Sequence, residues 1–190
     1  KRSKAKGNVI PPDAFIDSYG ADTLRLFILF LGPPEAEKEW SESGIDGAHR
    51  FLNRAWRLVD RYLNILTFKT QPVPEDSQSL KDLAYLTHKT IKKVTEDIDR
   101  FAYNTAIAAI MEFTNGLYRV IEGSPDAFNT HEGHEAIRSL VLLLAPFAPF
   151  ITEELWEELG GDFSVHQQPW PEYDPKLAQA ERITLVAQVN

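Results

Sequence analysis

Long rows of apolar side chains, spaced three and four positions apart, constrain the fold of this chain more than any other feature. The longest row predicts a helix over about 45–66, and its inward side chains are Ile45, Ala48, Leu52, Ala55, Val59, Tyr62, Leu63 and Leu66. Rows of the same period predict helices over about 79–101, 104–121, 135–145 and 151–159. Helices that bury one apolar face against one another form a bundle, so the sequence predicts an all-α fold.

Two shorter helices are predicted before this bundle. Residues 11–13, Pro-Pro-Asp, form a helix start, and this helix is expected to end near Gly20. We expect Asp22 to cap the second helix and to form an ion pair with Arg25. Apolar residues occupy almost every side of this helix between residues 24 and 31, which predicts that it is buried between other elements.

Composition limits the functions that the chain can have. Its 20 Lys and Arg residues against 28 Asp and Glu residues give a formal net charge of -8. An acidic protein is a poor general binder of nucleic acid, so any RNA contact requires a local basic surface and weakens with salt. The sequence contains no Cys, which excludes disulfides and fits a reducing cytoplasm. No apolar run reaches the roughly 20 residues that span a bilayer, and no signal peptide opens the chain, so we expect a soluble cytoplasmic protein with no membrane partner.

Four arginines share the outer face of the longest predicted helix. They follow one another at steps of four, three and four residues, at Arg50, Arg54, Arg57 and Arg61. Such a row could follow the phosphate backbone of an RNA. It could equally pair with carboxylates such as Asp46 and Asp60, or with a neighbouring helix. We predict that these four residues contact a phosphate backbone.

A basic loop opens the sequence. Three lysines lie between residues 1 and 6, among small polar residues, and Gly7 and Asn8 close the segment. Ammonium groups this close repel one another in water, and Ser3, Gly7 and Asn8 favour turns, so the segment is suited to wrap a polyanion. A solvated basic tail is the alternative that these residues alone leave open.

Several blocks of the sequence resemble a known enzyme family along the whole length of the chain. The opening loop is similar to the Lys-Met-Ser-Lys-Ser loop of class I aminoacyl-tRNA synthetases. Blocks around Glu39–Ser41, Ala48–Arg54, Pro146–Trp156, Ser164–Pro171 and Ile183–Asn190 resemble the leucyl-tRNA synthetases in particular. Synthetases specific for valine, isoleucine or methionine are an alternative, which the Trp170 and Asn53–Arg54 blocks argue against.

This resemblance implies an activity for a longer parent enzyme. That enzyme would attach leucine to its tRNA with ATP and Mg²⁺, as a leucine-tRNA ligase, and this segment alone would be inactive and hold no cofactor. Lys1 and Lys4 match the family's loop lysines and would act in catalysis; the residues implied in ATP binding are Lys1, Ser3, Lys4, Gly7 and Asn8. The loop departs from the family at Arg2, where Met is usual, and at Ala5, where Ser is usual.

The resemblance also implies how the chain is divided. Residues 1–43 would end the catalytic domain, residues 44–160 would form the anticodon-binding helical bundle, and residues 161–190 would cover its surface and begin a further domain. The alternation of apolar residues over 183–189 is typical of a strand, which has no partner within this chain. The expected partners are leucine tRNA for a monomeric enzyme, with ATP and leucine. With this partner, the residues expected to bind tRNA are Arg50, Arg54, Arg57 and Arg61. A helical scaffold with no direct RNA contact is the rival interpretation.

A pair of histidines invites a catalytic interpretation that we reject. His131 and His134 with Gly133 superficially resemble the His-x-Gly-His element of class I synthetases, but that element precedes the lysine loop in the family. No third metal ligand is indicated near them, and no phosphate-binding Gly-Lys-Ser/Thr loop occurs in the sequence. We therefore predict no metal site.

Overall fold

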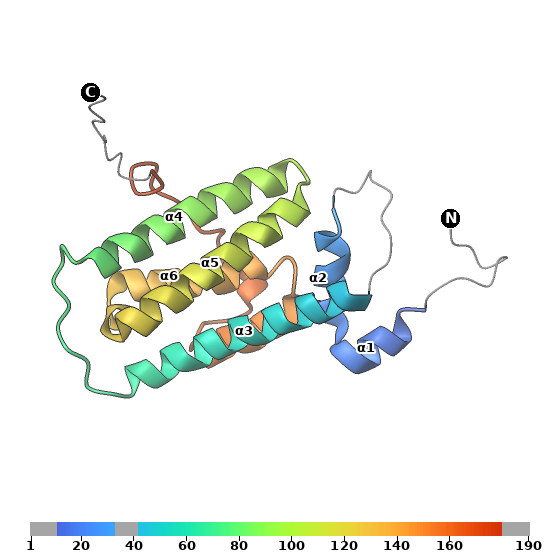
Figure 1. Ribbon diagram of the computed structural model, residues 1–190, viewed down its shortest axis with the longest axis horizontal. Helices are drawn as coiled ribbons and strands as arrows, with labels where there is room; N and C mark the ends of the chain where they lie inside the picture. Colours follow the sequence, from blue (N-terminus) through green and yellow to red (C-terminus); the bar gives the residue numbers. More distant parts are fainter. Residues whose placement is uncertain (1–10, 33–41, 180–190) are drawn as a thin grey trace, which may run out of the picture.

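The computed structural model describes residues 11–32 and 42–179. In chain order the helices are α1 (Asp13–Tyr19), α2 (Ala21–Phe30), α3 (Glu42–Leu66), α4 (Gln78–Asp99), α5 (Tyr103–Gly123), the 3₁₀ helix η2 (Pro125–Asn129), α6 (His131–Leu144), α7 (Pro149–Glu158) and the 3₁₀ helix η3 (Val165–Gln167). Every regular element in these ranges is helical, so the predicted all-α bundle is confirmed (Figure 1). The predicted strand over 183–189 lies outside the described residues.

The central helix is α5, which packs against α2, α3, α4 and α6. Its fully buried side chains are Ala106, Ile107, Ile110, Leu117 and Ile121. At Gly116, a Cβ atom would lie 2.9 Å from a methyl carbon of Leu86 on α4, so the absence of a side chain lets these two helices approach closely. The α4–α5 pair therefore forms one closely packed wall of the bundle.

The inward face predicted for α3 is confirmed. Its apolar row from Ile45 to Tyr62 is buried, Leu63 is partly buried, and only Leu66 at the end of the helix is exposed. The helix period then places the four arginines on the opposite side of α3, and all four are exposed.

The role predicted for Asp22 is wrong, because α2 begins two residues earlier than that interpretation requires. Gly20 is the residue before the helix, with φ of 84°, and Asp22 lies in the first turn. Its carboxylate accepts a hydrogen bond of 2.7 Å from the backbone N–H of Ile151, in the first turn of α7. Asp22 thus caps α7, which is distant in sequence.

The predicted Asp22–Arg25 ion pair is also absent from the described residues. The Arg25 guanidinium instead donates to the carbonyl of Pro146 at 3.0 Å, just before α7. Both side chains therefore join α2 to the α6–α7 connection. The prediction that α2 is buried on all sides is wrong as well: Leu26 and Phe27 are buried, but Ile28 is 52% exposed.

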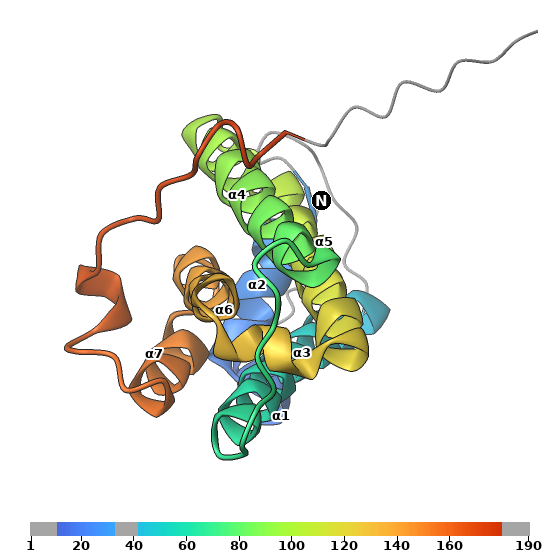
Figure 2. The same cartoon turned by 90° about the vertical axis from the view of Figure 1, so that its left-hand side faces the viewer.

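After α7 the described part of the chain, up to residue 179, returns across the bundle. Figure 2 shows this segment leading from α7 back to α4. Trp170 donates its indole N–H to the hydroxyl of Thr95 on α4 at 2.8 Å. The backbone N–H of Asp174 donates to Nδ1 of His88, also on α4, at 3.2 Å. These bonds fix the segment on the outer side of α4.

Candidate nucleic-acid interface

Two arginines of the α3 row have a contact with α5, and two have no ion-pair partner among the described residues. Arg61 lies 3.9 Å from Glu122 on α5, and the Arg54 guanidinium lies 5.0 Å from the ring centre of Tyr118. No ion pair of the described residues involves Arg50 or Arg57. Exposed arginines without internal partners are free to meet an outside anion.

The carboxylates that the sequence offered as partners for this row do not take that role. Asp46 accepts a hydrogen bond of 2.8 Å from the hydroxyl of Tyr19 on α1. Asp60 is exposed and takes part in no ion pair of the described residues. The alternative of pairing with a neighbouring helix holds at one end of the row only, through Arg61 and Glu122. An exposed pair at this distance contributes about 0–1 kcal/mol to stability, so it leaves Arg61 available to a competing phosphate.

A second group of cations, which sequence reasoning did not assign to the RNA site, lies on α4. Lys89, Lys92 and Lys93 are all exposed. Lys93 contacts both carboxylate oxygens of Asp97 at 2.7 Å, which neutralises an otherwise buried charge. Lys89 lies 5.3 Å from the ring centre of Tyr85. Lys92 forms only an exposed ion pair of 4.0 Å with Glu96, so Lys89 and Lys92 both remain available to an outside anion.

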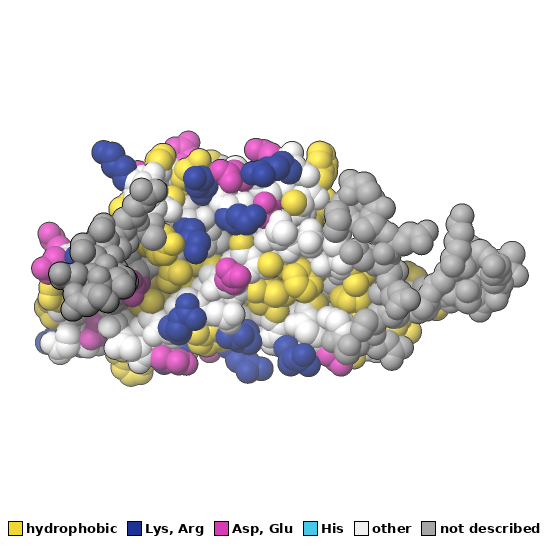
Figure 3. All heavy atoms as spheres, turned by 45° about the horizontal axis from the view of Figure 1, so that its top comes forward, with side chains coloured by type: hydrophobic (Ala, Val, Ile, Leu, Met, Phe, Trp, Pro, Cys, Tyr) yellow, Lys and Arg dark blue, Asp and Glu magenta, His cyan; other side chains and the backbone are white. Residues whose placement is uncertain are grey.

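These two groups lie on either side of α5. Figure 3 shows Lys and Arg side chains in an upper and a lower group, with hydrophobic side chains and a carboxylate between them. A hollow of about 760 Å³ lies beside the α4 group, and its lining includes Lys89, Lys92 and Lys93 of α4 with Asn115 and Arg119 of α5. We call the exposed surface formed by the α3 arginines, these α4 lysines and Arg119 the basic face.

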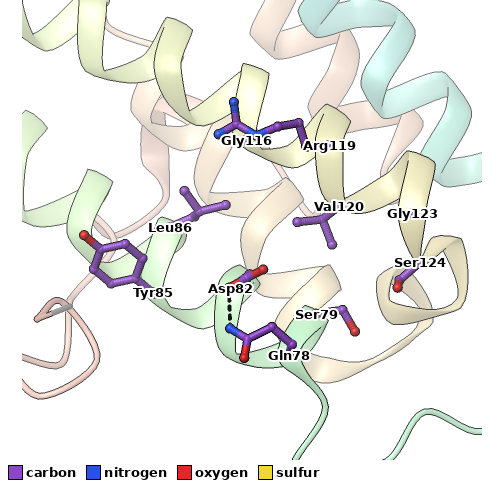
Figure 4. A pocket seen from close by; sticks show the side chains of 10 residues that line it. All are labelled: Gln78, Ser79, Asp82, Tyr85, Leu86, Gly116, Arg119, Val120, Gly123 and Ser124. Carbon is purple, nitrogen blue, oxygen red and sulfur yellow. Dashed lines mark hydrogen bonds between the residues drawn. The ribbon is translucent and has the colours of Figure 1, made fainter. Parts of the chain in front are cut away.

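Two further hollows continue the basic face. One of about 580 Å³ contains Arg50 and Arg54 at the α3 side, and it shares Asn115 with the hollow beside α4. Another of about 540 Å³ shares Arg119. Figure 4 shows that this last one lies between α4 and α5, with Asp82 and Gln78 joined by a hydrogen bond of 2.8 Å. Asn115 and Arg119 thus connect three hollows along the outer side of α5.

The histidine pair has a structural role in the described part of the chain. Thr130 caps α6, accepting from the N–H of Gly133, so this helix begins at His131. His134 is hydrogen-bonded to the hydroxyl of Tyr62 on α3. Burial lowers the pKa of His134, and the neighbouring charge of His131 lowers it further. Burial raises the pKa of Tyr62, and the charge of Arg138 partly opposes that effect.

Residues 11–32 and 42–179 contain no group of three or more His, Cys, Asp or Glu side chains placed to hold a metal ion. The loop residues Lys1, Ser3, Lys4, Gly7 and Asn8 lie outside the described residues, so their predicted roles remain predictions. None of the described helices combines the length and apolar character needed to cross a membrane.

Comparison with known proteins decides the family. Residues 81–190 match the family described as the anticodon-binding domain of tRNA ligase. The chain belongs to this family. The basic face is therefore a feature of an anticodon-binding domain, although part of it, the arginine row of α3, precedes the matched residues.

One relative is a ligase specific for leucine. The chain is 52% identical over 197 aligned residues to a leucine–tRNA ligase of Syntrophobacter fumaroxidans, with 100% of this chain and 23% of the relative covered. The resemblance to leucyl-tRNA synthetases inferred from sequence blocks is thereby confirmed. The chain spans less than a quarter of the length of that relative.

Solved structures agree with this assignment. The fold matches the agnB2 LeuRS of Agrobacterium radiobacter K84, solved as a ternary complex with tRNA and LeuAMS, with a TM-score of 0.80 and 36% identity over 95% of this chain and 23% of that one. A methionyl-tRNA synthetase of Mycobacterium tuberculosis matches with a TM-score of 0.67 and 21% identity, over 85% of this chain and 36% of that one. The second likeness shows a shared fold alone.

Proposed function

We propose that this anticodon-binding domain holds the tRNA of a leucine-tRNA ligase through its basic face. The observation that carries the proposal is the gathering of exposed cations on one side of a chain whose formal net charge is -8. Family membership and the 52% identity to a leucine ligase support tRNA as the partner. The likeness to a LeuRS solved with tRNA supports it further.

The chemistry of the basic face suits the RNA backbone rather than particular bases. Guanidinium groups bind phosphate oxygens through paired N–H donors, and a row of them on one helix can meet successive phosphates. Double-stranded RNA is recognised mainly by its shape and through phosphate and 2′-hydroxyl contacts. We therefore propose that Arg50, Arg54, Arg57 and Arg61 contact phosphates and read no base.

The parent activity proposed is the ATP-dependent attachment of leucine to tRNA. By resemblance, Lys1 and Lys4 would stabilise charge on the triphosphate during adenylate formation, and Ser3, Gly7 and Asn8 would shape the loop around ATP. ATP would supply the α-phosphate that the leucine carboxylate attacks, with pyrophosphate as the leaving group, and Mg²⁺ would neutralise the phosphates. We further propose a monomeric cytoplasmic enzyme divided at residues 1–43, 44–160 and 161–190, with leucine as its other substrate.

A helical scaffold without RNA contact is the second candidate. The Arg61–Glu122 pair and the Arg54–Tyr118 contact favour it, because they use part of the arginine row inside the bundle. It predicts that charge reversal in this row changes stability but not RNA affinity.

Titration with leucine tRNA and with an unrelated tRNA across a salt series distinguishes the two. We expect both tRNAs to bind, because phosphate contacts carry no sequence information. The Arg54→Glu/Arg57→Glu variant should raise the Kd at low salt by about tenfold or more, since a hydrogen bond to a charged group contributes about 1.5–3 kcal/mol. The slope of log K against log salt should also become shallower by about 0.7–0.9 for each lost contact.

The matched control is Lys69→Glu/Lys176→Glu, which makes the same change in net charge at exposed residues outside the basic face. It should leave the Kd close to that of the original chain. Circular dichroism checks that both variants keep their helices. Equal losses in the two variants, or no tRNA binding at low salt, would contradict the proposal and favour the scaffold.

A further inference from the structure

The hollow of about 580 Å³ on the α3 side of the basic face has an aromatic interior. Its lining comes from α2, α3 and α5 and includes Phe27, Phe30, Phe51 and Met111. Phe27 and Phe51 are buried, whereas Phe30 at the end of α2 is 39% exposed. A volume of this size falls within the range of about 300–1,000 Å³ that is typical of ligand sites. We call this space the α2–α3 hollow, and Phe30 offers aromatic surface there to a group from outside.

Gly47 leaves the α2–α3 hollow open. It lies inside α3, where glycine is less favourable to the helix than alanine. A Cβ atom at Gly47 would meet no described atom within 4 Å, so packing within the described bundle does not require glycine here. Gly44, one turn earlier, differs, because a Cβ atom there would lie 2.5 Å from the Phe27 ring. The space beside Gly47 is therefore available to an outside group.

The charged residues that line the α2–α3 hollow are all positive. Arg50 and Arg54 belong to its lining, and no Asp or Glu is among the described residues there. The other two hollows of the basic face differ from it. Glu96 and Glu112 line the one beside α4, and Asp82 lines the one between α4 and α5. An aromatic hollow with two guanidinium groups and no carboxylate matches a ligand in which a flat apolar group is joined to an anion.

An unpaired RNA nucleotide has this combination of groups. Its base has a flat face that stacks on aromatic side chains, and its phosphate pairs with arginine. A protein segment of apolar residues matches the aromatic surface but leaves both guanidinium groups without an anion. The surroundings of the hollow therefore favour a nucleotide over a protein side chain.

We propose that the α2–α3 hollow takes the base of one unpaired tRNA nucleotide, stacked on Phe30, with the adjoining phosphate on Arg50. Arg50 is exposed and has no ion-pair partner among the described residues, while Arg54 already contacts the ring of Tyr118. The inference rests on the proposed function and deepens it. Phosphate contacts hold the RNA, and the hollow selects a place where a base is already free of its pair, because moving such a base costs least. Stacking reads no sequence, which agrees with phosphate contacts that read none.

Titration of the 190-residue chain with three RNA probes tests the proposal. The probes are a short paired duplex, the same duplex with one bulged adenosine, and the same duplex with an abasic nucleotide at the bulge. The two bulged probes carry the same phosphates and differ only in the base. The adenosine bulge should bind about tenfold more tightly than the abasic bulge, since stacking on an aromatic side chain has about this effect. Equal Kd values for these two probes would overturn the proposal and leave the hollow to a protein segment.

Variants that fill the hollow or change its ring locate the base. Gly47→Leu should remove the difference between the two bulged probes, because its side chain takes the place of the base. Gly123→Leu is the matched control: Gly123 also has open space at its Cβ position and ends α5, but it does not line the α2–α3 hollow. It should keep the full difference. Circular dichroism checks that both variants fold. If Gly47→Leu also keeps the full difference, the base binds elsewhere and the proposal fails.

The Phe30 ring provides a second test that does not depend on filling the hollow. Phe30→Leu keeps an apolar side chain but removes the aromatic face, so it should reduce the preference for the adenosine bulge several-fold. Phe30→Tyr keeps that face and should retain the preference. Equal preferences in the two variants would contradict stacking on this ring.

Failure of this proposal is distinguishable from failure of the proposed function. If the two bulged probes bind alike while Arg54→Glu/Arg57→Glu still weakens binding of the paired duplex, the hollow takes no base and the basic face stands. If that arginine variant binds the paired duplex normally while Gly47→Leu loses the preference for adenosine, the hollow stands and the phosphate role of the arginine row fails.

Discussion

The basic face and the end of the bundle where Ile28, Pro146 and Phe150 are exposed, here called the apolar end, present opposite chemistry. On the basic face, exposed arginines and lysines from three helices surround hollows, and Arg50, Arg57 and Arg119 have no ion-pair partner among the described residues. At the apolar end, large side chains are exposed and the cation at its centre, Arg25, is satisfied by a carbonyl. The two surfaces therefore offer different chemistry to a partner: charge on one, apolar area on the other.

The largest effect on stability is expected at the hydrogen bond between Asp22 of α2 and Ile151 of α7. Asp22→Ala removes the acceptor for the Ile151 N–H and should lower the free energy of unfolding by about 1–3 kcal/mol, because a helix cap is lost and a partly buried donor is left unpaired. Urea denaturation measures this loss. If the two surfaces are independent, the Kd for tRNA should remain unchanged at urea concentrations below the unfolding transition.

Asp22→Asn is the matched control for this substitution, because it keeps an oxygen acceptor at the same position. It should lose less stability than Asp22→Ala. An equal loss in both variants would show that the negative charge, rather than the hydrogen bond, stabilises the start of α7.

A smaller effect is expected from the α4 side of the basic face. Lys89→Glu/Lys92→Glu should raise the Kd for tRNA by about tenfold at low salt, because phosphate contacts with lysine are point-charge interactions that solvent screens. Stability should change little, since both side chains are exposed and the i,i+4 pair of Lys92 with Glu96, at 4.0 Å, contributes about 0.3–0.5 kcal/mol. Fluorescence anisotropy with labelled tRNA measures the change. An unchanged Kd would restrict the basic face to α3.

The smallest effect is the pH dependence of stability that comes from His134, a residue outside both surfaces. Because burial lowers the pKa of His134 below its usual 6.5, the folded state favours the neutral ring and the unfolded chain takes up the proton first. Its contribution to stability is therefore complete above pH 6.5 and declines as the pH falls below that value. His134→Gln, which keeps a partner for Tyr62, should flatten this part of the curve of unfolding free energy against pH. Parallel curves for both proteins would contradict this account.

The sequence predicted what depends on local periodicity. The inward side of α3 and the outward direction of its arginines follow from spacing alone, because one helix has only one apolar side. Spacing within α4 is also consistent with the exposure of Lys89 and Lys92. It could not show that they lie on the same face of the bundle as Arg54, since that depends on how α4 packs across α5.

Two other features depended on contacts that are long in sequence. In the sequence Asp22 looks like an ordinary cap of its own helix, but it lies in the first turn of α2, and the approach of α7 gives its carboxylate a donor 129 residues away. Ile28 looked buried because its neighbours are apolar, yet no described element covers that side of α2. An apolar pattern cannot distinguish burial within a domain from burial against another one.

The most direct test of the basic face is to map protection by tRNA with lysine- and arginine-specific reagents and mass spectrometry. The account predicts that tRNA lowers the modification of Arg50, Arg57, Lys89 and Lys92 several-fold, while Lys69 and Lys176 react as they do without RNA. If tRNA protects Lys69 and Lys176 instead, or leaves all six side chains equally reactive, the basic face is not the surface that binds tRNA.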